Sequence, residues 1–212
     1  MSDAGQQRLI LASASPRRAA LLRQLGLPFE QVVSPEEEPV PDGSPAEIFA
    51  RTSAQAKARA VRRLIQARSG STEPVLVIGA DTVVCRGRTI LGKPADGAAA
   101  AAMLRSLSGR THRVCTGICV AGDQTLELDD CVVTRVRMRL LSPAEIAGYV
   151  AGGEPLDKAG AYGIQGLGAR FIERIEGCYY NVVGLPLARL CALLEAAGYR
   201  FPPVSQPTVT AA

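Results

Sequence analysis

Tryptophan is absent from this sequence of 212 residues, and all aromatic residues together make up only 4% of it. A buried core must therefore be built from smaller apolar side chains, which are plentiful in a chain that is 47% hydrophobic. That composition is typical of an α/β fold. The length is long for one domain and short for two, so we expect a single compact unit, with room for two lobes.

Histidine is almost absent, because His112 is the sole example in the chain. A Ser-His-Asp or Cys-His catalytic group, or a histidine-rich zinc site, would need this one residue. We interpret His112 as structural, packed or hydrogen-bonded at the start of a strand. The G-x-x-x-x-G-K-[ST] loop is also missing, which disfavours a Walker-type nucleotidase.

The six cysteines include no C-x-x-C pair and suggest no disulfide framework. Cys115, Cys119 and Cys131 lie in apolar, strand-like stretches. We therefore expect buried thiols in a reducing cytoplasm. The N-terminus has no apolar signal core, and no run approaches the roughly 18 uncharged apolar residues that a membrane span needs, so a cytoplasmic protein without membrane contact is expected.

Neither sign of charge dominates, since 24 basic and 20 acidic residues give a formal net charge of +4. The basic residues are spread along the chain and form no tail, which argues against stable binding of nucleic acid. A small anionic substrate needs only a local basic cleft, so the composition remains compatible with one.

Strand-like and helix-like segments alternate along the chain, which predicts an α/β domain with a mixed sheet. The expected strands are 9–12, 29–33, 74–84, 111–121, 125–140 and 171–175, and the expected helices begin after Ser15, Ser44, Asp96 and Ser142 and at Pro186. In the second helix, the apolar face is expected to carry Ile48, Ala56, Ala60, Leu64 and their neighbours. We expect one domain over residues 1–201 and a flexible tail over residues 202–212.

The turn from strand 9–12 into the first helix combines Ser13 with the adjacent Arg17 and Arg18. Ser15 is placed as N-cap and Pro16 as the first helical residue. Free N–H groups at a helix N-terminus favour an anion, and two guanidiniums can grip phosphate oxygens. The turn therefore indicates a phosphate site, and the alternative is an ordinary capped helix with two solvated arginines.

Asp81 is expected at the end of the apolar strand 74–84, where a charged carboxylate is costly unless a metal, a cation or several donors compensate it. A general base or a metal ligand is the favoured role, and a turn cap is the alternative. Lys93, in a tight Gly-Lys-Pro loop, is close enough in sequence to share a cleft and neutralise phosphate charge. The acidic loop 36–38 offers oxygen ligands for Mg²⁺ or Mn²⁺, although such loops are more often only solvated.

Several segments, in the same order along the chain, closely resemble those of the Maf family. They are LASASPRR at 11–18, GADTVV at 79–84, LGKP at 91–94, LSGRTH at 107–112, DKAGAYGIQG at 157–166 and YNVVGLP at 180–186. The resemblance extends from about residue 9 to residue 198, so it does not depend on chance agreement at one short motif.

The resemblance implies an elongated Maf/ITPase-like α/β fold, with flanking helices and two lobes around a central cleft. It also implies a homodimer that hydrolyses the bond between the α- and β-phosphates of nucleotides with a divalent metal, Mg²⁺ or Mn²⁺. The form of the segment around Gln165 resembles the branch that acts on dTTP and UTP, as distinct from the branch for 7-methyl-GTP. The expected products are the nucleoside monophosphate and pyrophosphate.

Carried over onto this sequence, the resemblance makes Asp81 the general base and a metal ligand, with Lys93 beside it as a catalytic cation. The substrate-binding positions are Ser13, Arg17, Arg18, Lys57, Thr82 and Gln165, of which Arg17, Thr82 and Gln165 are associated with substrate choice. Glu38 would help to bind the metal, and the run of three glutamates leaves Glu37 open as an alternative.

Two alternatives to a dTTP and UTP pyrophosphatase remain at this point. The chain is a regulatory protein of septum formation that binds nucleotide without turnover, or a pyrophosphatase for non-canonical purine nucleotides. Intact Asp81, Lys93 and Arg17 favour an enzyme over a binding module. Gln165 can donate and accept at once, as the O4 and N3–H edge of a pyrimidine requires, so it disfavours the purine reading. The alternative for Gln165 is that its amide ties its own loop together.

Overall fold

The computed structural model describes residues 7–36, 39–69, 74–123 and 125–202. The strands are β1 (Arg8–Leu11), β2 (Glu30–Gln31), β3 (Val75–Arg86), β4 (Thr89–Leu91), β5 (Thr111–Ala121), β6 (Glu127–Met138) and β7 (Ile172–Glu176). They form one sheet in the order β2-β1-β3-β5-β6-β7, with β4 paired to β3. β1 is parallel to β2 and β3, and the other neighbours are antiparallel, which confirms the predicted mixed sheet.

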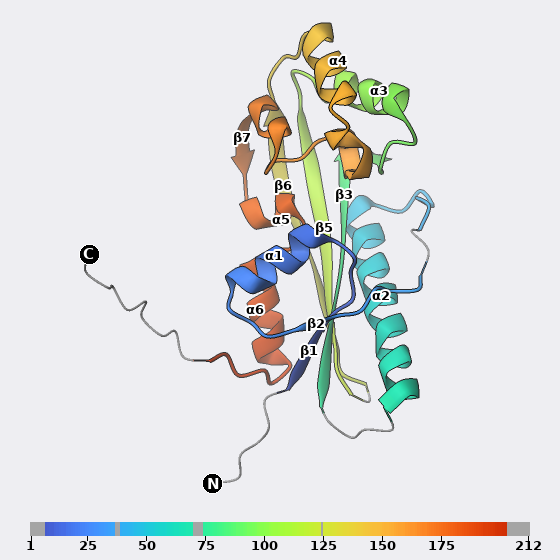
Figure 1. The fold of residues 1–212 in the computed structure, drawn as a ribbon, viewed down its shortest axis with the longest axis vertical. Helices are drawn as coiled ribbons and strands as arrows, with labels where there is room; N and C mark the ends of the chain where they lie inside the picture. Colours follow the sequence, from blue (N-terminus) through green and yellow to red (C-terminus); the bar gives the residue numbers. More distant parts are fainter. Residues whose placement is uncertain (1–6, 37–38, 70–73, 124, 203–212) are drawn as a thin grey trace, which may run out of the picture.

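Helices flank the sheet on both faces. They are α1 (Pro16–Gln24), α2 (Ala46–Ser69), α3 (Gly97–Leu107), α4 (Pro143–Ala151), α5 (Tyr179–Val183) and α6 (Leu187–Ala196), with short 3₁₀ turns η1 (Glu154–Asp157), η2 (Ala159–Ala161) and η3 (Leu167–Phe171). Figure 1 shows α2 along one face of an elongated sheet and α1, α5 and α6 on the other. Of these helices, α5 was not predicted from the sequence, because its 5 residues are too few to show a helical period.

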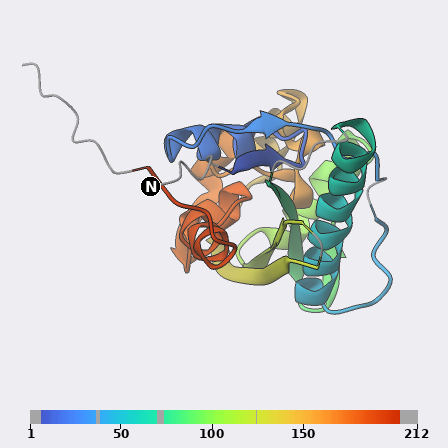
Figure 2. The ribbon, with the colours of Figure 1, turned by 90° about the horizontal axis from the view of Figure 1, so that it is seen from below.

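Two large buried cores mark two lobes of the molecule, and two smaller apolar clusters lie between α2 and the sheet. One core lies between the sheet and the pair α1 and α6, and includes Leu22, Ile78 and Leu190. The other lies where α3 and α4 gather at one end of the sheet, and includes Leu104 and Val136. Seen from below in Figure 2, α2 and α6 lie on opposite sides of the sheet. The predicted elongated α/β fold with flanking helices is confirmed.

Helix α2 packs closely on the sheet because two strand glycines leave room for its backbone. A Cβ on Gly79 would lie 2.2 Å from the carbonyl oxygen of Ala54, and one on Gly117 would lie 2.2 Å from that of Ala50. The helix therefore turns its small residues toward the sheet. Of the apolar face predicted for α2, Ala60 is buried and Ala56 and Leu64 are partly buried, whereas Ile48 is 48% exposed.

The predicted N-caps of α1, α3 and α4 are confirmed. The Ser15 side chain accepts a hydrogen bond in the first turn of α1, and the Asp96 side chain does so in α3. Ser142 and Glu145 form the two reciprocal bonds of a capping box at the start of α4. β2 is shorter than the predicted strand 29–33.

His112 is buried at the start of β5, where its Nε2 lies 2.8 Å from the hydroxyl of Tyr162. Burial lowers the pKa of His112 from 6.5 to about 4, so the ring is neutral near pH 7. The structural interpretation of this residue is confirmed.

All six cysteines are free thiols. Cys115 and Cys119 are buried as expected, whereas Cys131 is only partly buried. Among the described residues, no helix is long and apolar enough to cross a membrane. The expected tail, 202–212, lies outside the described residues from residue 203 onward.

Candidate active site

A cleft of about 450 Å³ opens between the start of α1, the middle of β3 and the segment that follows α4. All the described residues that were predicted for the site line it: Ser13, Arg17, Arg18, Lys57, Asp81, Thr82, Lys93 and Gln165. Glu38, the predicted metal ligand, and its alternative Glu37 lie outside the described residues, while the neighbouring Glu36 lines the cleft. Residues far apart in the sequence thus meet at one surface.

Asp81 lies in the middle of β3, opposite Gly117 of β5, and not at the end of a strand as expected. The strand continues past Asp81, because Val84 and Cys85 pair with both β4 and β5. The role of a turn cap is therefore excluded. Lys57 of α2 places its Nζ 2.5 Å from Asp81 Oδ1, and both side chains are largely buried. This ammonium compensates the charge of the carboxylate away from bulk water.

Arg18 joins three parts of the cleft wall. Its guanidinium donates to Ser13 Oγ at 3.2 Å, to Thr82 Oγ1 at 3.0 Å and to the carbonyl oxygen of Gly184 at 2.8 Å. Thr82 Oγ1 also lies 3.0 Å from Thr116 Oγ1 on the neighbouring strand. The turn before α1, strand β3 and the loop after α5 are therefore held in a fixed relation around the cleft.

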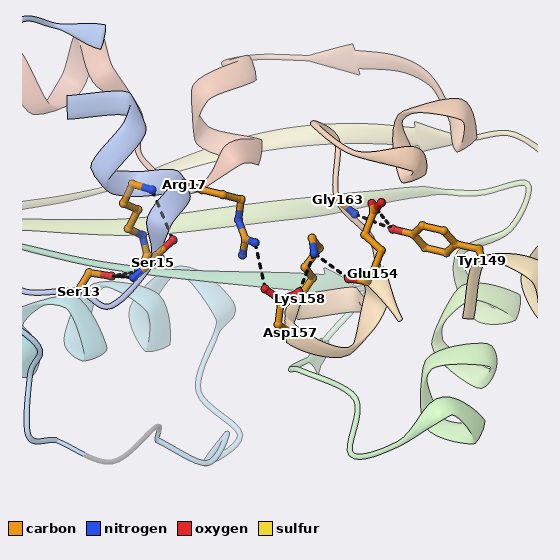
Figure 3. Close-up of polar contacts among 9 residues, drawn as sticks. Ser13, Ser15, Arg17, Tyr149, Glu154, Asp157, Lys158 and Gly163 are labelled. Atoms are coloured by element: carbon orange, nitrogen blue, oxygen red, sulfur yellow. Dashed lines mark hydrogen bonds and ion pairs between the residues drawn. The ribbon is translucent and has the colours of Figure 1, made fainter. Parts of the chain in front are cut away.

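Arg17 forms an ion pair with a residue that was not predicted for the site, Asp157 of η1, with 3.3 Å between Nη1 and Oδ2 (Figure 3). Lys158 donates to the other oxygen of this carboxylate at 2.6 Å. Burial raises the pKa of Asp157, but the hydrogen bonds from Lys158 and Arg17 outweigh burial and lower it. The two lobes are thus connected across the cleft. The segment 157–166 resembles one of the Maf family, but the sequence did not indicate that Asp157 pairs with Arg17.

Gln165 lies on an exposed loop that forms one wall of the cleft. This loop is held by backbone N–H groups, since that of Gly163 donates to Tyr149 and those of Leu167 and Gly168 donate to Glu154. Within the part of the chain that the structure describes, the Gln165 amide makes no hydrogen bond to its own loop.

The carboxylates of the cleft fit a metal that is bound largely by water and substrate. Within the described ranges, no group of three or more His, Cys, Asp or Glu side chains is arranged to hold a metal ion. Asp81 and Glu36 both line the cleft. Mg²⁺ is commonly bound by one or two carboxylates together with substrate phosphates, and Mn²⁺ suits the same oxygen ligands, so this donor set is suitable for either ion.

Comparison with known proteins identifies relatives over almost the whole chain. The family model described as Maf-like protein matches residues 8–197. A dTTP/UTP pyrophosphatase of an Anaeromyxobacter species is 48% identical over 199 residues, which is 92% of each chain. One of Deinococcus radiodurans is 50% identical over 195 residues, 90% of this chain and 93% of the relative. A solved dITP/XTP pyrophosphatase of Mycobacterium abscessus covers 69% of this chain and 95% of its own, at 17% identity and a TM-score of 0.34, a likeness that supports no argument.

Proposed function

The chain belongs to the family of Maf-like proteins, and on this premise we propose that it hydrolyses dTTP and UTP to the nucleoside monophosphate and pyrophosphate. One observation carries the proposal. A buried carboxylate, Asp81, lies in a cleft whose lining also supplies Arg17, Lys93 and the start of a helix, which are the groups that bind polyphosphate. The cleft therefore combines a base with a surface for anions.

Asp81 is the group to which we assign proton transfer. Lys57 donates to Oδ1, so Oδ2 is the oxygen that accepts a proton from water. The water oxygen then bonds to the α-phosphorus as the bond from that phosphorus to the bridging oxygen breaks. Pyrophosphate leaves with the bridging oxygen, and the proton remains on Asp81 until it is released to solvent.

The cations of the cleft stabilise the charge of the phosphates. We assign Lys93 and Arg17 to the leaving pyrophosphate, and Arg18 and Lys57 to the same anion-binding surface. Ser13 lies in the turn before α1, where backbone N–H groups favour a phosphate. A divalent ion, when bound, supplies further neutralisation of the triphosphate, and Asp81 with Glu38 is the ligand pair that we assign to it.

Recognition of the base is assigned to the wall of the cleft that carries Gln165, with Thr82 and Arg17 facing the same space. One amide can donate to O4 and accept from N3–H, the edge that thymine and uracil share. Cytosine presents an amino group and an unprotonated nitrogen at these positions, so the same amide pairs with it only in the orientation turned over by about 180°. We also extend the proposal to a homodimer in the cytoplasm, which sedimentation and cell fractionation test.

The proposal is tested by pyrophosphate release from dTTP, UTP, CTP, GTP, ATP and 7-methyl-GTP, each with Mg²⁺, Mn²⁺ or EDTA. We expect release from dTTP and UTP that EDTA abolishes. Asp81→Asn should lower turnover by a factor on the order of 10² or more, because the amide still accepts from Lys57 but cannot take a proton from water. Circular dichroism checks that the variant is folded.

Asp129→Asn is the matched control, since this carboxylate lies on β6 and pairs with Arg51. It should retain the turnover of the wild type. Normal turnover by Asp81→Asn would remove the assigned base, and no release from any nucleotide would overturn the proposed function as a whole.

A further inference from the structure

The carboxylate of Glu154 lies directly behind the loop that carries Gln165, and it is surrounded by donors from that loop. Its Oε2 accepts from the backbone N–H of Leu167 at 2.8 Å, and its Oε1 from that of Gly168 at 3.2 Å. The hydroxyl of Tyr149 donates to Oε1 at 2.8 Å. One side chain thus fixes the backbone on the C-terminal side of Gln165.

Tyr149 extends the same arrangement to the other side of Gln165. Its hydroxyl oxygen accepts a hydrogen bond from the backbone N–H of Gly163 at 3.2 Å, and the same hydroxyl donates one to Glu154 (Figure 3). Gly163 precedes Gln165 by two residues, and Leu167 follows it by two. The backbone is therefore held on both sides of the residue whose side chain is exposed in the cleft.

The glycines of this loop allow it to fold closely around the carboxylate. A Cβ on Gly166 would lie 2.4 Å from Glu154 Oε1, and one on Gly168 would lie 2.7 Å from the hydroxyl oxygen of Tyr149. Burial raises the pKa of Glu154, but the N–H of Leu167, the hydroxyl of Tyr149 and the N–H of Gly168 lower it by more. The group is therefore an ionised acceptor, which is the form that these donors require.

A second contact connects Glu154 to the side of the cleft that binds Arg17. Lys158 donates to the backbone carbonyl of Glu154 at 2.7 Å and to Asp157 at 2.6 Å, and Asp157 accepts from Arg17. Figure 3 shows this series of contacts between Arg17 and the loop. Arg17 and Gln165, which both line the cleft, are thus held by neighbouring residues of η1.

We propose that Glu154 is a positioning residue for substrate choice, which fixes the loop 163–168 so that the Gln165 amide faces the base of the nucleotide. Glu154 is not among the described residues that line the cleft, so it acts through Gln165 and not by contact with substrate. This inference rests on the proposed function, because only a nucleotide substrate gives the amide a base to read. Glu154 is then the group that holds the base-recognising Gln165 in place.

The test compares wild type with Glu154→Gln, Gln165→Ala and the double variant, using UTP and CTP, which differ only at the base edge. Glu154→Gln keeps the shape of the side chain but presents an NH₂ group to at least one N–H donor. We expect the preference for UTP over CTP in kcat/KM to fall about tenfold, since small displacements of a positioned group are costly. In the Gln165→Ala background, adding Glu154→Gln should leave the preference unchanged, because the amide that recognises the base has already been removed.

Hydrogen exchange of the peptide that covers residues 163–168 gives a readout that needs no substrate. The amides of Leu167 and Gly168 should exchange about tenfold faster in Glu154→Gln than in wild type. Glu173→Gln is the matched control, because this exposed carboxylate of β7 pairs only loosely with Arg137, at 3.6 Å. It should change neither the exchange nor the preference.

Tyr149→Phe keeps the proposal testable if Glu154→Gln does not fold, since it removes one oxygen and leaves the ring against Phe171. It should weaken the preference in the same direction. The inference is overturned if a folded Glu154→Gln keeps the wild-type preference for UTP over CTP. It is also overturned if Glu154→Gln lowers that preference by the same factor in the Gln165→Ala background. In both cases, turnover by the wild type still upholds the proposed function. If wild type hydrolyses no nucleotide, the proposed function fails, and with it the role in substrate choice; the exchange rates then decide whether Glu154 holds the loop.

Discussion

Lys57 and Asp81 form an ion pair in a part of the molecule where neither side chain has much access to water. A buried pair contributes little net stability, because the loss of hydration offsets the attraction between the charges. Removal of one partner is a different matter, since it leaves the other charge buried and uncompensated. The pair is therefore best understood as an arrangement that keeps a charged carboxylate in the cleft.

Lys57→Met should lower the free energy of unfolding by about 3 kcal/mol at pH 7, measured by urea denaturation. Combining it with Asp81→Leu should recover most of that loss, because no buried charge then remains. Arg63→Met is the control on the same helix, since Arg63 pairs with Glu36 in an exposed position and should cost less than about 1 kcal/mol. Equal losses in Lys57→Met and Arg63→Met would contradict the burial of the pair.

Among the elements, helix α2 determines where Lys57 can reach. The glycines on β3 and β5 let the backbone of α2 approach the sheet at Ala50 and Ala54, in the turns before Lys57. A larger residue at either glycine would push the helix outward. The close approach of helix and sheet is therefore a condition for the short distance between the ammonium and the carboxylate of Asp81.

Gly117→Ala should destabilise the fold by about 1–3 kcal/mol and lower turnover, because the added Cβ meets the backbone of Ala50 and not a flexible side chain. Gly148→Ala is the matched control, since a Cβ there meets nothing within 4 Å and alanine is favoured in the interior of α4. It should raise stability slightly. A thermal melt of both variants, with a turnover assay, compares the two effects; a neutral Gly117→Ala would contradict the packing.

At the scale of the whole molecule, the two lobes share the long strands β3 and β5 and meet again across the cleft (Figure 1). The ion pair between Arg17 and Asp157 is one such connection. His112 makes a connection within the second lobe, from the start of β5 to Tyr162. Because this histidine is the sole one in the chain, no other histidine contributes to the pH dependence of the free energy of unfolding.

The stability of the wild type should decrease as the pH falls from 6.5 to 4. Burial lowers the pKa of His112 to about 4, so in this range the unfolded chain binds a proton that the folded protein does not. The contribution of His112 is complete above 6.5, and about 3 kcal/mol is lost at pH 4. In His112→Phe, urea denaturation at several pH values should show a smaller slope in this window. An identical slope would mean that His112 is protonated in the folded protein.

Much of the fold and of the site could be predicted from the sequence. Ser15, Asp96 and Ser142 marked helix starts correctly, because a cap is a local hydrogen bond between neighbours in the chain. The apolar face predicted for α2 is buried at Ala60 and exposed at Ile48, because the apolar period does not reveal that two distant glycines select small residues. The short helix α5 was missed for lack of length.

The sequence by itself determined the α/β class, the order of most elements and the structural role of His112, and its resemblance to the Maf family indicated residues that line the cleft. The class and the order of the elements rest on composition, period and caps, and the period and the caps act over a few residues. Only the tertiary structure decided that Lys57 meets Asp81, 24 residues away, and that Arg17 meets Asp157, 140 residues away. Which charges become partners depends on sheet register and on how closely a helix packs, and neither is encoded by any single segment of the chain.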